Sequence, residues 1–213
     1  MSHPTPDYGH ILKAPYRDAV YEPAEDTFLL LDALEADAAR LSSLSPRLCL
    51  EIGTGSGCAL TFLSSLLGPK NADINALCTR AARETGKRSS AWIDPVRTDL
   101  VHGLRRGHGQ GLVDVLLFNP PYVPTDPAEV GSHGIEASWA GGKDGREVLD
   151  RLLPLIHELL SPKGIFYLVT VEENIPEDIA SMLKTHGIHG KAVMKRKTGP
   201  EALSIWRYSR MKL

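Results

Sequence analysis

Apolar and polar positions follow two different periods along this chain. Short apolar runs of strand length stand between longer segments in which apolar residues recur every three or four positions. The short runs are typical of β-strands and the longer segments of helices. Their regular alternation predicts an α/β fold, in which a mostly parallel sheet is covered by helices on both faces.

The apolar runs predict six strands, and the longer segments predict five helices. We expect strands near residues 47–52, 92–97, 113–118, 164–171, 190–195 and 203–208. We expect helices near residues 25–41, 56–67, 75–85, 145–160 and 176–186. The last two strands, which are joined by residues 196–202, have the pattern of a hairpin that closes the sheet. Alternating units followed by an antiparallel end favour a Rossmann-like fold of the class I methyltransferase type.

Length and charge narrow the class of protein. The 213 residues, 42% of them hydrophobic, suit a single globular domain, expected over 21–213 after an N-terminal extension of residues 1–20. A formal net charge of −2 provides no general cationic field for nucleic acid. Cys49, Cys58 and Cys78 fit neither a zinc site nor a disulfide framework, and no segment has the apolar length of a membrane span. We expect a soluble intracellular protein that acts in the cytoplasm, with the nucleus as a second location.

A glycine-rich turn joins the first expected strand to the next helix. Gly53, Gly55 and Gly57 let the backbone bend sharply and admit a ligand against its amides. Their G-x-G-x-G spacing differs from the dinucleotide fingerprint G-x-G-x-x-G, and Glu51 lies just before them. A carboxylate there would repel a pyrophosphate but attract the ammonium group of S-adenosylmethionine. The turn alone also fits a tight strand-to-helix connection, but these two details favour S-adenosylmethionine as the cofactor.

Two further acids follow later strands. Asp73 lies twenty positions after Gly53, where an acid at the end of the second strand commonly binds the ribose hydroxyls. Asp99, next to Leu100, follows the third strand and is expected to read the adenine edge. Either aspartate alone would fit a helix cap or a loop. Acids at three successive strand ends would all lie at the carboxyl edge of the sheet, where open α/β folds bind their ligands.

Three motifs carry a resemblance to a known family. The runs 21-YEPAEDTFLLLDAL-34, 118-FNPPY-122 and 131-GSHGIEASWAGGKDGREV-148 resemble the HemK-type glutamine methyltransferases. The likeness is strongest to the eukaryotic and archaeal branch that modifies the class I peptide release factor, and it covers residues 20 to 208. The Asn-Pro-Pro-Tyr run also marks a wider set of amino-group methyltransferases, whereas the two longer motifs are more specific.

The resemblance implies a fold and a set of site residues. The fold is a seven-stranded sheet of order 3-2-1-4-5-7-6 with an antiparallel last strand. The residues implied for cofactor contact are Thr27, Glu51, Gly53, Gly55, Gly57, Asp73, Asp99, Leu100 and Asn119, and those implied for catalysis are Asn119, Pro120 and Tyr122. The product would be S-adenosylhomocysteine. Members of this branch usually have more residues before the ribose acid, and residues 66–75 leave almost nothing here for the second strand.

The residues of the Asn-Pro-Pro-Tyr run suit an amide substrate. An amide nitrogen is a poor nucleophile because its lone pair is delocalised into the carbonyl. The side-chain oxygen of Asn119 and the carbonyl of Pro120 can each accept one N–H of a target amide, while Tyr122 packs on the amide plane. Pro121 has no N–H to compete for those acceptors. Catalysis would then consist of positioning, with no general base needed before methyl transfer.

The third strand is expected at the edge of the sheet. Pro95 is tolerated there because an edge strand has one side unpaired. Trp92, Ile93 and Val96 would make this edge apolar and suited to extension by a partner strand, although it could also be simply solvated. The resemblance implies the partner, a small zinc-binding activator protein shared by several methyltransferases, and hence a heterodimer.

Four functions fit these observations. The leading one is methyl transfer from S-adenosylmethionine to a glutamine side-chain amide in the Gly-Gly-Gln loop of a class I peptide release factor. The alternatives are methylation of a protein lysine, for example in a histone, methylation of adenine in nucleic acid, and a cofactor-binding scaffold without turnover. Adenine methylation is disfavoured by the net charge of the chain.

Two remaining clusters are expected to be surface features. His186 and His189 have a spacing that binds metals on helices, but Gly187 would break a helix there, so we predict no metal site. The basic residues between 191 and 197 fit a solvated hairpin. The glycine-rich run 141–148 lacks a Walker lysine–serine pair, and the resemblance places it beside the substrate as a mobile cover.

Overall fold

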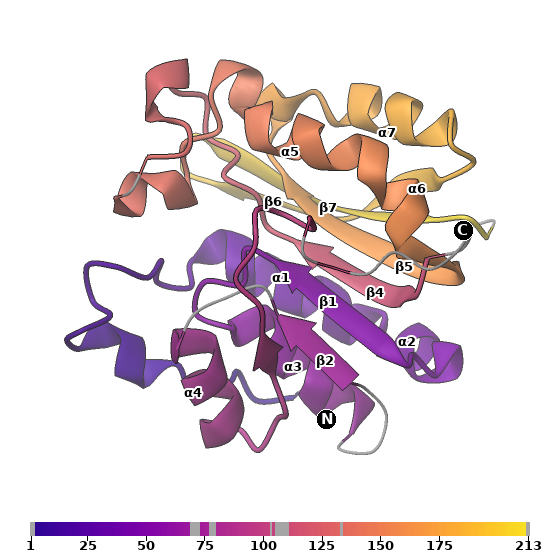
Figure 1. Cartoon of the computed structure of the whole chain (residues 1–213). Helices are drawn as coiled ribbons and strands as arrows, with labels where there is room; N and C mark the ends of the chain where they lie inside the picture. Colours follow the sequence, from indigo (N-terminus) through magenta and orange to yellow (C-terminus); the bar gives the residue numbers. More distant parts are fainter. Residues whose placement is uncertain are drawn as a thin grey trace.

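The computed structural model describes residues 3–68, 80–102, 104, 111–132 and 134–211, and only the backbone of residues 73–76. Its centre is a seven-stranded sheet of order β3-β2-β1-β4-β5-β7-β6, which agrees with the expected order (Figure 1). The strands are β1 (Leu48–Ile52), β2 (Asp73–Ala76), β3 (Asp94–Pro95), β4 (Val113–Phe118), β5 (Leu160–Thr170), β6 (His189–Thr198) and β7 (Glu201–Ser209).

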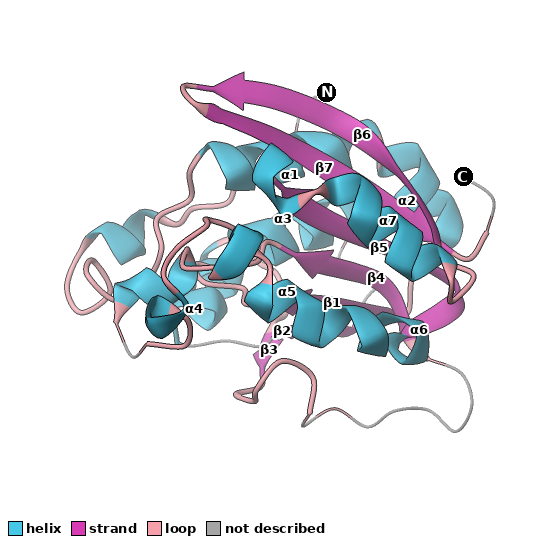
Figure 2. Ribbon diagram, turned by 90° about the horizontal axis from the view of Figure 1, so that it is seen from above, coloured by secondary structure: helices cyan, strands magenta, loops and turns pink. Residues whose placement is uncertain are grey.

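The pairs β3–β2, β2–β1, β1–β4 and β4–β5 are parallel, and β7 is antiparallel to both β5 and β6. The β6–β7 hairpin turns at Gly199 and forms one edge of the sheet (Figure 2). In the register of the two central strands, Ile52 at the end of β1 lies opposite Phe118 at the end of β4. The glycine turn and the Asn-Pro-Pro-Tyr run therefore begin side by side.

Helices cover both faces of the sheet. Figure 2 shows α1, α2 and α3 on one side of it and α5, α6 and α7 on the other. The helices are α1 (Glu25–Ala36), α2 (Ala38–Leu44), α3 (Cys58–Leu67), α4 (Arg80–Arg88), α5 (Glu147–Leu152), α6 (Ile156–Leu159) and α7 (Pro176–Lys184). Short 3-10 turns are η1 (Gly9–Leu12), η2 (Pro127–Glu129), η3 (Ile135–Ser138), η4 (Lys143–Gly145), η5 (Leu153–Leu155) and η6 (Glu172–Asn174). None of the helices in the described part of the chain is long and apolar enough to span a membrane.

The core has one apolar cluster on each face of the sheet. Alternate residues of a strand point to opposite faces. Val115 accordingly packs in the cluster under α1 and α3, and Leu116 in the cluster under α5 and α7. Both strands at the centre are buried almost throughout, which explains why β4 reads as a continuous apolar run in the sequence.

Two expected helices are interrupted in the structure. The helix expected at 25–41 is divided into α1 and α2 at Asp37, whose backbone (φ −94°, ψ 8°) leaves the helical region. The helix expected at 145–160 is divided into α5, η5 and α6, and Pro154 lies at the start of η5. A proline lacks the N–H of a regular helical hydrogen bond, which explains the second interruption.

The edge of the sheet that β2 and β3 form also differs from expectation. The helix predicted over 75–85 is wrong at its start, because residues 73–76 form β2 and α4 begins at Arg80. The strand predicted over 92–97 contains only Asp94 and Pro95. With so few residues between α3 and α4, the chain uses the Asp-Ile-Asn-Ala segment itself to build β2.

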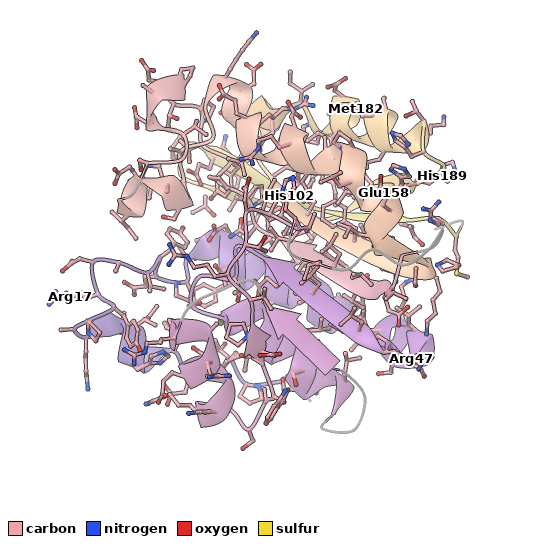
Figure 3. The ribbon with its side chains drawn as sticks, in the orientation of Figure 1. Arg17, Arg47, His102, Glu158, Met182 and His189 are labelled. Carbon is pink, nitrogen blue, oxygen red and sulfur yellow. The ribbon has the colours of Figure 1, made fainter. Side chains whose placement is uncertain are left out.

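Residues 3–20, which we expected to be an extension of the domain, fold onto α4. Arg88 donates two hydrogen bonds to the Asp7 carboxylate, at 2.6 and 3.0 Å. The His10 ring lies within hydrogen-bonding distance of the Ala81 carbonyl, with Nε2 3.2 Å from the oxygen. Figure 3 shows Arg17 on this segment and Arg47, just before β1, at opposite ends of the molecule. Residues 3–20 therefore lie toward the carboxyl end of β1.

Candidate active site

A cavity of about 320 Å³ opens at the carboxyl ends of β1 and β4. Its described walls come from the N-terminal segment, the start of α1, the glycine turn, the start of α3, the end of β4 and η3. Apolar side chains such as Leu30 and Phe118 alternate with polar ones such as Thr27 and Glu51. This size and mixed lining are typical of a small-molecule site at the switch point of an open α/β sheet.

The glycine turn needs residues without side chains, for two different reasons. Gly53, Gly55 and Gly57 all have positive φ (+66°, +47° and +77°), a region that favours glycine. Gly53 and Gly55 line the cavity. Gly57 does not, and a Cβ on it would lie 2.6 Å from the Cα of Ala82 in α4. Gly57 was predicted to contact the cofactor, but what it does in this structure is let α3 and α4 pack closely.

Glu51 is buried at the end of β1 and faces the first turn of α3. The Leu60 amide donates a hydrogen bond of 3.1 Å to its Oε2. Burial raises the pKa of Glu51 to about 7, and the Leu60 amide opposes this shift. Glu51 therefore titrates near neutral pH, and a cation in the cavity would favour its ionised form.

Asn119 follows β4 and is held by Asp26, a buried residue in the first turn of α1. The Asn119 Nδ2 group donates to Asp26 Oδ2 at 2.8 Å, and the Tyr122 hydroxyl donates to the same oxygen at 3.4 Å. The other oxygen of Asp26 accepts from the Thr27 amide at 2.6 Å and from the Tyr21 hydroxyl at 3.4 Å. The Asn119 Oδ1 atom is buried and has no hydrogen-bond partner among the described residues. An acceptor is thus left for a ligand.

A second asparagine supports the Asn-Pro-Pro-Tyr loop from behind. Asn174, in η6, is buried, and its Nδ2 donates to the carbonyls of Tyr122 and Asp144, each at 2.9 Å. A Cβ on Gly145 would lie 1.9 Å from the Tyr122 carbonyl oxygen. The run 141–148 therefore lies directly beside the loop, and Asn174 connects the two. Its expected place beside the substrate as a mobile cover stays a prediction.

Five of the residues proposed for the site come together at the cavity. They are Thr27, Glu51, Gly53, Gly55 and Asn119. Pro120 and Tyr122 are buried and are not among the residues that line it. Tyr122 packs in the apolar cluster beneath α1, so in this structure it supports Asn119 instead of facing the cavity.

Asp99 and Leu100 lie outside the described walls of the cavity, contrary to expectation. The carboxylate of Asp99 is 62% exposed and forms an ion pair with Arg151 of α5. His102, labelled in Figure 3, lies with its Nδ1 2.8 Å from the Asp99 carbonyl oxygen. Leu100 packs against the core cluster under α5. The Asp99 carboxylate is thus bound to a surface arginine and is not among the groups that line the cavity.

Asp73 was expected at the end of the second strand, and this is wrong. It is the first residue of β2 and lies opposite Leu48, the first residue of β1, whereas Glu51 lies opposite Ala76. Asp73 and Ala76 are three residues apart along β2, which corresponds to roughly 10 Å in a strand. Asp73 therefore starts at the amino edge of the sheet, away from the cavity, and its side chain, like Cys78, lies outside the described residues.

Sequence reasoning missed two residues of this site, Asp26 and Asn174. For Asp26 there was a signal, because it lies next to Thr27 in one of the family-like motifs and is an acid on the buried face of an apolar helix. A buried acid is rare unless it has partners. Asn174 follows two glutamates in a short connection, and no local pattern sets it apart.

Fold and site define a class I methyltransferase, and solved structures agree. The N-terminal domain of human METTL16 with S-adenosylhomocysteine has a TM-score of 0.57 at 15% identity, over 97% of this chain and 78% of that chain, which supports the fold alone. Mtq2 from the E. cuniculi Mtq2-Trm112 complex has a TM-score of 0.65 at 30% identity, over 89% of this chain and 98% of that chain. No family model matches the chain.

Curated relatives narrow the class to a family. Methyltransferase HEMK2 of Mus musculus is 54% identical over 98% of each chain, and HEMK2 of Homo sapiens is 51% identical over 97% of this chain and 96% of the other. The eRF1 methyltransferase catalytic subunit mtq2 of Schizosaccharomyces pombe is 42% identical over 90% of each. The chain belongs to the HemK-type glutamine methyltransferase family, in its eukaryotic branch.

Proposed function

We propose that this chain transfers a methyl group from S-adenosylmethionine to a glutamine side-chain amide in the Gly-Gly-Gln loop of a class I peptide release factor. The observation that carries the proposal is the buried acceptor Asn119 Oδ1, which has no partner among the described residues and belongs to a residue of the cavity wall. A relative named as an eRF1 methyltransferase subunit supports the choice of substrate.

The cavity suits a cofactor that carries a cation and no phosphate. Glu51 is the buried acid at the glycine turn, and it would hold the ammonium group. Gly53 and Gly55 let the backbone lie directly against the ligand. When bound, S-adenosylmethionine supplies an electrophilic methyl group on a positively charged sulfur. The ribose contact is left unassigned, because Asp73 starts at the other edge of the sheet.

The chain contributes to the reaction by holding the target amide. One N–H of the amide would donate to Asn119 Oδ1 and the other to the carbonyl of Pro120. Pro121 has no N–H that could occupy either acceptor. With the cofactor bound, the target nitrogen oriented in this way would accept the methyl group as the methyl–sulfur bond breaks and S-adenosylhomocysteine leaves, and the nitrogen would afterward lose one proton to water. Positioning replaces a general base in this scheme.

The same acceptors discriminate between target groups. A glutamate carboxylate supplies no N–H and would face the oxygens of Asn119 and Asp26. A lysine could donate, but the Asp26 carboxylate would favour its ammonium form, which has no lone pair for methyl transfer. Glutamine is the target group that both donates and stays neutral.

A panel of three release-factor substrates tests this function. The target position carries glutamine, glutamate or lysine, and methylation is mapped by mass spectrometry between pH 7 and pH 9.5. We expect glutamine to be methylated at a rate that stays flat with pH. Glutamate should remain unmodified, and lysine should react slowly, with a rate that climbs about tenfold per pH unit toward the lysine pKa near 10.4. Faster methylation of lysine than of glutamine at pH 7 would contradict the proposal.

We further propose that a small zinc-binding activator protein binds the β3 edge of the sheet, in keeping with the Mtq2 relative solved with Trm112. Trp92, just before β3, is 78% exposed. Ile93, which we also expected at this surface, is only 6% exposed and packs against Gly86 of α4. Val96 is half-buried, so Trp92 is the apolar anchor that remains. The proposed substrate also favours the cytoplasm as the place of action.

A further inference from the structure

We propose that Asp26 is a positioning residue that fixes the orientation of the Asn119 amide and thereby determines that the site accepts N–H donors. This inference rests on the proposed function, because it concerns how that reaction's target amide is held. Asp26 lies 93 positions before Asn119 in the chain and is proposed to act on the target amide through Asn119.

The contacts of Asp26 divide cleanly between its two oxygens. Oδ2 accepts from Asn119 Nδ2 at 2.8 Å and from the Tyr122 hydroxyl at 3.4 Å. Oδ1 accepts from the backbone amide of Thr27 at 2.6 Å. Asp26 is 3% exposed, so water does not compete for these bonds. The Thr27 bond anchors the carboxylate to the first turn of α1, where the helix dipole favours negative charge.

The orientation of Asn119 follows from this anchor. The two ends of a side-chain amide have nearly the same size and shape but opposite hydrogen-bonding character. In the observed orientation, Nδ2 faces the carboxylate of Asp26 and Oδ1 faces away from it. The flipped orientation would set Oδ1 against a carboxylate oxygen and offer Nδ2 to the substrate. A target amide N–H would then meet a donor.

Asp26 is the determinant of this choice among the described residues. The Asn119 Oδ1 atom has no described partner that could favour either orientation. The hydrogen bond from Asn119 Nδ2 to Asp26 is therefore the contact that fixes the orientation of the amide. A purely structural acid would stabilise α1 and β4 against each other without affecting which end of Asn119 meets the substrate.

An exchange of the two residues separates these roles. Asp26→Asn leaves the amide of Asn119 without a carboxylate to orient it, and Asn119→Asp brings two carboxylates together. The double variant restores a donor–acceptor pair with the roles exchanged. The amide at position 26 then donates to the carboxylate at position 119, whose second oxygen accepts from the substrate. We expect each single variant to lose about 100-fold in kcat with release factor, and the double variant to regain all but about tenfold. Cofactor affinity should stay within about threefold throughout.

Two controls keep the outcomes distinct. Asp32→Asn, on the exposed face of the same helix, removes an acid that pairs with Arg196 and should leave kcat unchanged. Exchange of the Asn119 side-chain amide protons, followed by NMR without substrate, should be slow in the wild type and fast in Asp26→Asn.

If the wild type leaves release factor unmodified, the proposed function fails while the exchange rates still decide this inference. A double variant no better than the poorer single one, or unchanged exchange in Asp26→Asn, would overturn it.

Discussion

Glu51 and Asn119 show how buried polar residues reveal a site. Both lie at the ends of adjacent central strands, where an apolar side chain would pack without cost. Glu51 has its pKa raised to about 7 by burial, and Asn119 keeps a buried oxygen without a described partner. Buried polar groups of this kind are unfavourable unless something satisfies them. A cation and an amide donor in the cavity would satisfy both.

The raised pKa of Glu51 makes a testable prediction about pH. Because the ionised form would attract the ammonium of the cofactor, we expect S-adenosylmethionine to bind about tenfold more weakly at pH 6 than at pH 8. Glu51→Gln should bind weakly at both values, with little change between them. Calorimetric titration at several pH values measures this. An equally steep pH dependence in Glu51→Gln would show that another group is responsible.

The same group affects folding stability with a definite sign. The pKa of Glu51 is about 7 in the folded chain and 4.5 in the reference state. The folded state thus retains a proton that the unfolded state releases between these values. The free energy of unfolding of the wild type should therefore fall by about 3 kcal/mol relative to Glu51→Gln as pH rises from 4.5 to 7, and level off above that.

Sequence reasoning found the parts of the site that local patterns reveal. Glu51 and the glycine turn are contiguous, and Asn119 is marked by the prolines after it. Asp26 was missed because its role depends on a hydrogen bond to a residue 93 positions away. Asp99 was expected at the cavity but pairs instead with Arg151, a residue 52 positions later in the chain that no sequence pattern connects to it.

At the scale of elements, the two thinnest strands were the hardest to predict. The two residues of β3 and the four of β2 are too few to show a period, and β2 was read as the start of a helix. The central strands were predicted to within a residue because burial on both faces gives them continuous apolar runs. A thin outer side leaves β3 at an open edge of the sheet, which is where a partner strand can add.

The β3 edge gives a prediction about the partner. We expect Trp92→Glu to weaken binding of the zinc-binding activator by at least about 30-fold, because a central tryptophan often contributes about 2 kcal/mol to an interface. Leu112→Glu is the matched control, since Leu112 is 59% exposed and precedes β4, which lies three strands from β3 in the sheet. Binding is measured by calorimetry with the purified activator. Equal effects of the two substitutions would remove β3 as the binding edge.

At the scale of the whole molecule, the site is assembled from segments far apart in the sequence. The parallel register of β1 and β4 brings the glycine turn beside Asn119. Helix α1 adds Asp26, the N-terminal segment adds Tyr21, and η6 supports the loop through Asn174. The alternation of elements was enough to predict the α/β class, and the family resemblance supplied the strand order. The contacts between distant segments could be seen only in three dimensions.

The central claim is that Asn119 holds the target glutamine and not the cofactor. Its most direct test is a paired measurement on the wild type and Asn119→Ala, in which the methylation rate of release-factor glutamine is measured by mass spectrometry and S-adenosylmethionine affinity by calorimetry. We predict that the rate falls at least about 100-fold while the affinity changes by less than about threefold. A variant that keeps its turnover, or one whose cofactor affinity falls as far as its rate, would contradict the claim.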